Sequence, residues 1–354
     1  MRRRDSGFSI LELVIALAIA GLVLAAATTF FIGSVRQYKI QTKIVESNIE
    51  GVLGLELLRQ DLESTGFGVP WDNVTPGQDK STPPFNVFSG GPMAVVSLDN
   101  PSSGTVTVNA SDYLVIRSSR VGTGSAAGKW TTLQAGGGTR SWGSPEEDLD
   151  PNDRVIVLSP TLNHRTLVTP GTGILFSAAA SYAPADNLTV TNIVYGVDSA
   201  NLSFPWNRAD YYIDNVLPTV VPQRCAPNTG VLVKRVVSQA GGTLNAPLPL
   251  LDCVADMEVI YGLDTNGDKM VEVWVNDISP FPADTIRTQL AEVRVHILAQ
   301  EGQRDDTYTH PVNPILVGSP DLGSSFGKTI SIDNFRNYRW KVYTVVVKPR
   351  NLAN

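Results

Sequence analysis

One short stretch of the sequence contains several side chains that could bind a metal ion through oxygen atoms. These are Asp264, Asn266, Asp268 and, four residues further along, Glu272. Oxygen ligands at alternate positions suit a hard cation, so these four residues form a candidate calcium site. The match to a helix-loop-helix calcium loop is incomplete, because the glycine comes one position early and the twelfth position is Val275. Asn-Gly is also a strong hairpin signal. A tight turn is therefore the main interpretation, with calcium as the alternative and no cofactor required.

Residues suited to enzymatic catalysis are scattered. His164, His296 and His310 occur singly, and the sequence contains neither an H-E-x-x-H motif nor a G-x-S-x-G elbow. His296 falls in the polar register of a predicted strand, which indicates a surface or hydrogen-bonded residue. The acidic run at 146–148 lies in a Gly- and Pro-containing loop and is typical of a solvated turn. We therefore predict that the protein is not an enzyme.

The sequence contains two cysteines, Cys225 and Cys253, with no C-x-x-C motif or Cys/His cluster beside them. A sulfur-based metal site is therefore not indicated. If this part of the chain lies outside the cytoplasm, a disulfide between the two is the preferred interpretation. Two buried, unpaired thiols are the alternative.

One further acid, Glu12, stands at the edge of an apolar segment. Residues 13–34 carry no formal charge, which is enough helix to cross a bilayer core of about 30 Å. An acid in such a segment is costly and requires a partner. Three arginines precede the segment and should stay in the cytoplasm, which places the rest of the chain across and beyond the membrane. A plain single-pass anchor with an incidental glutamate is the alternative to a functional acid.

Beyond the membrane the helix is predicted to continue to about residue 64. Apolar residues recur at intervals of three or four and should form one stripe facing a globular domain. They are Val45, Ile49, Val52, Leu55, Leu58 and Leu62. Gly66, Gly68 and Pro70 then end the helix.

The remainder is predicted to be a large β-rich body. Alternating or β-branched runs predict strands at 93–98, 105–110, 113–117, 154–158, 188–195, 230–237, 254–263, 270–276, 292–299 and 340–348, with a helical turn at 286–290. Glycine-rich stretches at 122–128 and 136–138 lack phosphate-loop spacing and indicate loops. An inserted loop-rich lobe is expected at 120–225, where Trp130 and Trp142 are candidate contact residues. The fold class is α+β, with a long N-terminal helix packed on an antiparallel domain.

The charge balance is acidic, with 28 Lys and Arg against 34 Asp and Glu and a net charge of −6. An acidic body has no general attraction for nucleic acid, and none is predicted as a partner.

The order of basic leader, Gly7, Phe8 and Glu12 resembles the class III signal of type IV pilins and type II secretion pseudopilins. The resemblance implies cleavage by prepilin peptidase between Gly7 and Phe8, followed by N-methylation of Phe8. It also implies that Glu12 pairs with the Phe8 amine of a neighbouring subunit in the filament. Residues 1–7 would then be the leader, 8–34 the transmembrane half of the helix, 35–66 its extracytoplasmic half, and 67–354 the body.

Three further stretches are similar to PilW-type minor pilins, relatives of the pseudopilin GspJ. They lie at 57–67, 261–268 and 345–352. This resemblance implies a minor pilin that primes type IV pilus assembly with other minor pilins and sits near the pilus tip. Its implied partners are the other minor pilins, the major pilin, prepilin peptidase and the assembly platform. The protein would be held in the inner membrane by one span and then enter the extracellular filament. A type II secretion pseudopilin and a tip adhesin or ligand-binding subunit are the alternatives.

Overall fold

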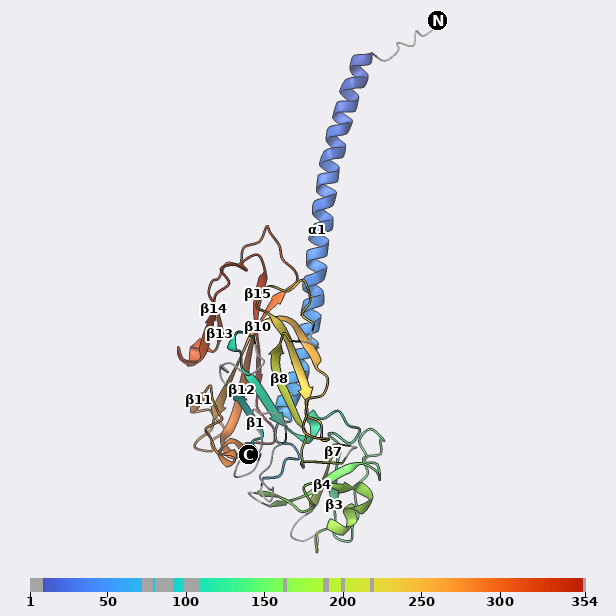
Figure 1. Cartoon of the computed structure of the whole chain (residues 1–354), viewed down its shortest axis with the longest axis vertical. Coiled ribbons are helices and arrows are strands. Elements are labelled where there is room, and N and C mark those ends of the chain that lie inside the picture. The colour runs from blue at the N-terminus through green and yellow to red at the C-terminus, as the bar shows by residue number, and fades with distance from the viewer. Residues whose placement is uncertain are drawn as a thin grey trace.

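The computed structural model describes residues 9–71, 79, 92–98, 108–161, 164–186, 191–198, 201–216 and 220–352. Gly7, Phe8 and the predicted leader lie outside this part of the chain, as do the first three residues of the strand predicted at 105–110. The architecture is a long N-terminal helix followed by an antiparallel β-rich body, which confirms the predicted fold class (Figure 1).

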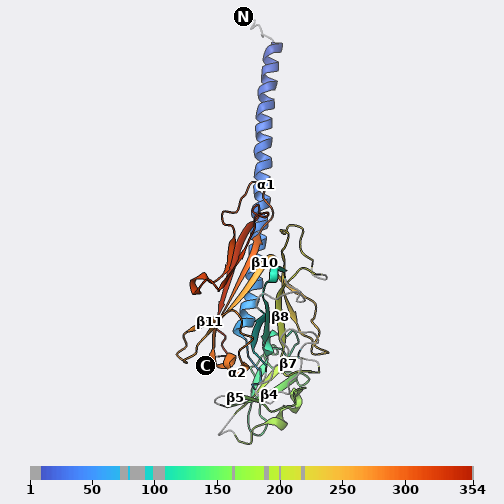
Figure 2. The ribbon, with the colours of Figure 1, turned by 60° about the vertical axis from the view of Figure 1, so that its left-hand side comes forward.

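The helix α1 is continuous from Ile10 to Glu63, a length of about 80 Å at 1.5 Å per residue. Its apolar half projects away from the body and ends at the pole marked N (Figures 1 and 2). This half is long and apolar enough to cross a bilayer, with a mean hydropathy of 2.7 over its most apolar 18 residues. The helix ends at Ser64, whose backbone N–H donates to Gln60 O at 3.0 Å. Gly66 then takes a φ of +77°, which favours glycine.

The single apolar stripe predicted on the extracytoplasmic half of α1 is wrong. Leu55, Leu58 and Leu62 are buried against the body, but Val45, Ile49 and Val52 are 56%, 57% and 66% exposed. The spacing explains the difference. In an α-helix, a side chain three residues further along points in a direction that is rotated by roughly 60° around the helix axis. Ile49, Val52, Leu55 and Leu58 are separated by three such steps, so Leu58 points about 180° away from Ile49. The extracytoplasmic half of α1 thus carries two apolar faces on opposite sides.

Small residues let α1 approach the sheet closely. A Cβ on Gly54 would lie 2.1 Å from Leu250 O, and one on Gly51 would lie 3.5 Å from a Leu251 methyl. Ser47 is buried on the same side of the helix. The face of α1 that packs on the body therefore begins with small side chains and ends in leucines.

The main sheet is antiparallel, in the order β1-β2-β8-β9-β10-β12-β15, with β11 added to one end of β10. Its strands are β1 Val95–Leu98, β2 Tyr113–Arg117, β8 Arg208–Asp214, β9 Gly230–Val236, β10 Leu248–Leu263, β11 Val273–Val275, β12 Leu290–Glu301 and β15 Arg339–Val347. The short helix α2, Ala283–Gln289, connects β11 to β12. The largest core cluster lies between this sheet and the last turns of α1.

A second antiparallel sheet forms the end of the body farthest from the N-terminus (Figures 1 and 2). Its strands are β3 Trp130–Leu133, β4 Arg154–Thr161, β5 His164–Leu167, β6 Ile174–Leu175 and β7 Asn192–Asp198. We call this unit, residues 130–198, the distal lobe. It has a β-sheet core of its own where a loop-rich lobe over 120–225 was expected, and β8 already belongs to the main sheet. Strands such as β3 and β5 are short and polar, which hid them in the sequence.

The other elements are small. Strands β13 Ile315–Gly318 and β14 Gly327–Ile330 pair as a hairpin. Four 3-10 helices are described, at Val108–Ala110, Ser119–Val121, Phe176–Tyr182 and Pro320–Leu322. The first of them replaces the end of the strand predicted at 105–110. Asn109 and Ala110 both take positive φ there, which an extended strand does not allow.

Candidate functional site

The predicted assembly acid Glu12 lies in the first turn of α1, among exposed apolar side chains. Its Oε2 accepts a hydrogen bond from Ser9 N at 3.0 Å, and Ser9 Oγ accepts one from Leu11 N at 3.3 Å. This reciprocal pair caps the helix. Ile10 and Leu11 beside it are 83% and 66% exposed. Glu12 therefore stands on an apolar surface with a partner from its own helix end.

The two cysteines form a disulfide, with their Cα atoms 5.0 Å apart. Cys253 lies in β10, and Cys225 lies in the connection between β8 and β9. The bond ties this connection to the longest strand of the main sheet. The alternative of two free thiols does not hold in this structure.

The turn at 264–272 brings all four candidate calcium ligands together at the junction of β10 and β11. Carboxylate oxygens of Asp264, Asp268 and Glu272 lie within 4.8 Å of one another. The turn also uses them itself. Asp264 accepts from the backbone N–H groups of Gly267 at 2.6 Å and Lys269 at 2.7 Å.

Other hydrogen bonds close the same turn. Glu272 Oε2 accepts from Thr265 N at 2.8 Å, and the Asn266 side-chain amide donates to Asp268 and Glu272. Burial acts to raise the pKa of Asp264, but the backbone donors outweigh it and hold this pKa below its ordinary value. The arrangement is that of a self-closed hairpin turn, in which the carboxylates serve as acceptors for backbone N–H groups.

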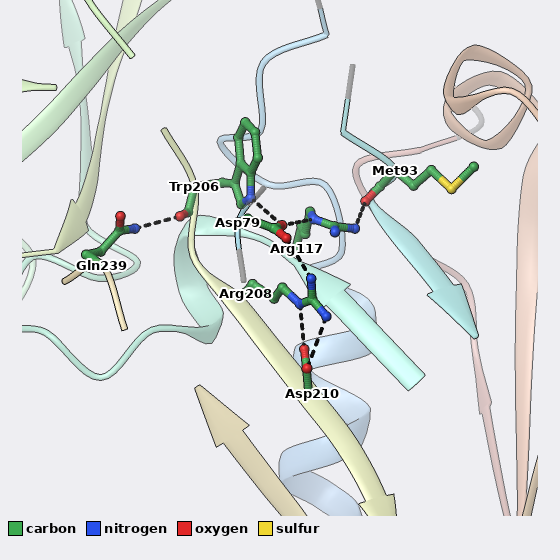
Figure 3. Close-up of polar contacts among 7 residues, drawn as sticks. All are labelled: Asp79, Met93, Arg117, Trp206, Arg208, Asp210 and Gln239. Atoms are coloured by element: carbon green, nitrogen blue, oxygen red, sulfur yellow. Dashed lines mark hydrogen bonds and ion pairs between the residues drawn. The ribbon is translucent and has the colours of Figure 1, made fainter. Parts of the chain in front are cut away.

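A buried charge network that sequence reasoning missed joins the distant residue Asp79 to the main sheet (Figure 3). Asp79 accepts from Arg117 Nε at 2.5 Å, from Arg208 Nη1 at 2.6 Å and from Trp206 Nε1 at 3.1 Å. Arg208 also donates to Asp210 Oδ1 at 2.7 Å. All four charged side chains have no exposed area.

The network is electrically balanced, with two arginines and two aspartates. Burial alone would raise the pKa of Asp79, but the guanidinium groups of Arg117 and Arg208 hold it below its ordinary value. A single aspartate in a Pro- and Gly-rich stretch carries no signal of this role. The network fixes the chain at Asp79 to β2 and β8, close to where the main sheet meets the distal lobe.

Trp130 and Trp142, the candidate contact residues, lie together in the distal lobe. Their ring centroids are 4.7 Å apart, and Trp142 Nε1 donates to Trp130 O at 2.7 Å. Both line a groove of about 940 Å³ between the distal lobe and the last turns of α1.

His296 and His310 are held as structural residues, whereas His164 is exposed in β5. His296 is buried in β12, and its ring nitrogens contact Thr344 Oγ1 at 3.1 Å and Ser319 Oγ at 2.9 Å. The hydrogen-bonded interpretation is therefore confirmed and the surface one is wrong. His310 contacts the carbonyl oxygens of Val312 and Trp340.

Comparison with known proteins gives two family matches. Residues 210–351 match the type IV pilus-assembly protein W family, and residues 2–28 match the prokaryotic N-terminal methylation motif. The first match runs from β8 to just beyond β15 and includes the disulfide and the 264–272 turn. No curated protein and no solved structure matches the chain.

Proposed function

We propose that this chain, a PilW-like type IV minor pilin by its two family matches, co-assembles with other minor pilins to prime the pilus and sits near its tip. The family is one of pilin subunits, and in this proposal the chain catalyses no reaction. The prepilin motif and the apolar helix indicate membrane anchoring before assembly.

The observation that carries the proposal is the second apolar face of α1. The uncharged segment ends at Ser34, yet Val45, Ile49, Val52 and Leu53 continue as an exposed apolar surface beyond it. Leu53 is 69% exposed. A bilayer covers only about 20 helical residues, so this face lies outside the lipid and requires another protein to cover it. Pilin helices from neighbouring subunits have the length and apolar character to do so.

Glu12 supplies the second support. After cleavage between Gly7 and Phe8, the new Phe8 amine of a neighbouring subunit would offer a positive charge to this carboxylate. An ionised acid at the edge of a membrane segment is unfavourable, so a charged partner would favour leaving the lipid for the filament. In this structure Glu12 accepts a hydrogen bond from the Ser9 N–H, which is uncharged and therefore a weaker donor than a protonated amine.

A minor pseudopilin of a type II secretion system would use the same helix physics. The family match names pilus assembly, and on that ground we place the chain in a pilus.

The test is complementation of a strain that lacks this protein, scored by the number of surface pili. The parent chain should restore pili, and Glu12→Ala should fail to do so while reaching the same level in the membrane. Glu46→Ala is the matched control, because it removes an exposed acid from the same helix outside the apolar segment. Normal piliation in the deletion strain, or with Glu12→Ala, would contradict the priming role.

A further inference from the structure

The groove between α1 and the distal lobe is built from five separate parts of the chain, one of which is Lys234 of β9. One wall is the end of α1, with Leu57, Gln60 and Glu63. The other wall is the distal lobe, with Trp130 and Trp142. The connection at 120–129 and the C-terminal residues 350–351 complete it. The distal lobe is the end of the molecule farthest from the N-terminus (Figure 1), and the groove lies on the side of this lobe that faces the end of α1.

The floor of the groove is fixed by a buried ion pair. Lys234 Nζ lies 2.5 Å from Asp61 Oδ2, and Tyr211 Oη donates to the same carboxylate. Asp61 comes from α1 and Lys234 from β9, and both are less than a tenth exposed. Burial raises the pKa of Asp61, against the opposing effects of Lys234 and Tyr211. The pair joins helix to sheet and leaves the floor rigid.

The indole rings are held in place before any ligand arrives. Asp148 accepts from Trp142 N at 2.6 Å and from Ser141 Oγ at 2.5 Å, which fixes the loop that carries Trp142. The indole N–H of Trp142 is already donated to Trp130 O. The Arg140 guanidinium lies over the Trp142 ring, with its Cζ 4.2 Å from the ring centroid. What the two half-buried tryptophans offer to the groove is therefore the ring surface that this contact and their own pairing leave free, at little cost in conformational entropy.

The charges that line the groove are balanced. Four acidic and four basic residues contribute: Asp61, Glu63, Glu146, Glu147, Arg120, Lys129, Lys234 and Arg350. Several are paired within the protein, such as Arg350 with Glu63 at 2.6 Å. Such a lining offers no net field to a polyanion or a polycation. It favours a neutral ligand with many groups that both donate and accept hydrogen bonds, as hydroxyls do.

A peptide fits the groove less well. Peptides commonly bind by adding a strand to an open sheet edge or by filling apolar pockets. The edge of β3 is covered, because Leu133 pairs with Thr139 and Trp130 O accepts from Trp142. Besides the two tryptophans, the large apolar side chains of the lining are Leu57 and Phe67, and Ala127 adds one methyl group.

We propose that this groove is a binding site for a neutral oligosaccharide, whose ring faces stack on Trp130 and Trp142 while its hydroxyls bond to the charged side chains. The volume of about 940 Å³ lies at the upper end of the roughly 300–1,000 Å³ range of small-molecule sites, which suits several sugar units. The site goes beyond the assembly role and does not depend on it.

The test uses the purified full chain in a zwitterionic detergent without a sugar head group. Calorimetric titration compares the neutral hexasaccharides maltohexaose, cellohexaose, hexa-N-acetylchitohexaose and mannohexaose with a heparin hexasaccharide and an uncharged dodecapeptide. We expect at least one neutral hexasaccharide to bind with a Kd below about 1 mM. No binding of any of the four, or tighter binding of heparin or of the peptide, would overturn the proposal.

Variants then locate the site. Trp142→Ala should weaken the binding about tenfold or more, in line with the loss of one stacking surface. Gln60→Ala changes an exposed side chain on the opposite wall and should weaken it without affecting the fold. Trp274→Ala, a half-buried tryptophan outside the groove, is the matched control and should bind like the parent. Equal affinity for the parent, Trp142→Ala and Gln60→Ala would also overturn the proposal. Trp142→Ala should still restore pili, which separates this site from assembly.

Discussion

Asp79 Oδ1 accepts a hydrogen bond from Arg208 Nη1 at 2.6 Å, and neither side chain has any exposed area. The two residues are 129 positions apart in the chain. Their contact, with Arg117 on the other carboxylate oxygen, holds the start of the body to the ends of β2 and β8 in the main sheet. These two strands are the ones that precede and follow the distal lobe in the chain, so the network joins Asp79 to both of its connections with the main sheet.

Asp79→Asn should destabilise the fold strongly. The change leaves Arg117 and Arg208 buried with Asp210 as their remaining carboxylate in the network, and breaking a buried ion pair costs roughly 3–5 kcal/mol. Urea unfolding of the full chain in detergent measures the decrease in the free energy of unfolding. Asp306→Asn, which removes an exposed pair with Arg304, should change stability by less than about 1 kcal/mol. Equal effects of the two variants would contradict the network's role.

The sequence predicted the features that depend on local pattern. The uncharged run and the residues that end the helix were enough to predict the extent of α1. The presence of two cysteines without a metal-site motif was enough to predict the disulfide. The two faces of α1 were missed because intervals of three and four both count as helical, although repeated steps of three rotate the stripe. Asp79 was missed because nothing near it in the chain indicates Arg117 or Arg208. The groove was missed because it exists only once α1 and the distal lobe pack together.

Glu258 should make stability fall as pH rises. Burial and the neighbouring Asp112 and Asp256 raise the pKa of Glu258 to about 9, with Lys328 opposing the shift. Between the unfolded value near 4.5 and about 9, the folded state holds a proton that the unfolded state has released. Stability therefore decreases with pH across this window.

Glu258→Gln should remove this dependence and raise stability at pH 8, because a neutral amide replaces a group that resists ionisation. Urea unfolding at several pH values from 5 to 9 measures how the free energy of unfolding depends on pH in the parent and in the variant. Glu147→Gln, at an exposed position, is the control and should keep the parent's slope. A parent whose stability is flat or rises over this range would contradict the prediction.

Loss of the disulfide should cost roughly 3–4 kcal/mol in the chain-entropy model, because Cys225 and Cys253 are 28 residues apart. The variant with serine at both positions should unfold at lower urea than the parent. Reducing agent should lower the urea concentration at which the parent unfolds to that of the variant. It should leave the urea concentration at which the variant unfolds unchanged. Equal stability of parent and variant without reducing agent would show that the bond contributes nothing.

The turn at 264–272 should be stable without calcium, because its carboxylates already accept hydrogen bonds within the turn. About 5 mM calcium, above the roughly 0.1–1 mM range of weak extracellular sites, should leave the Tm of the parent unchanged. Asp264→Ala should lower the Tm with or without calcium. A calcium-dependent rise in the Tm of the parent that is absent in Asp264→Ala would instead establish a cation site.

In the assembled filament, we expect another pilin subunit to cover the second apolar face of α1. The most direct measurement places a photo-crosslinking amino acid at Ile49, which is 57% exposed on that face, and irradiates piliated cells. We expect an adduct with another pilin subunit, and we expect this adduct to be lost in cells without prepilin peptidase, where no filament forms. Piliated cells that yield no pilin adduct from Ile49 would contradict it.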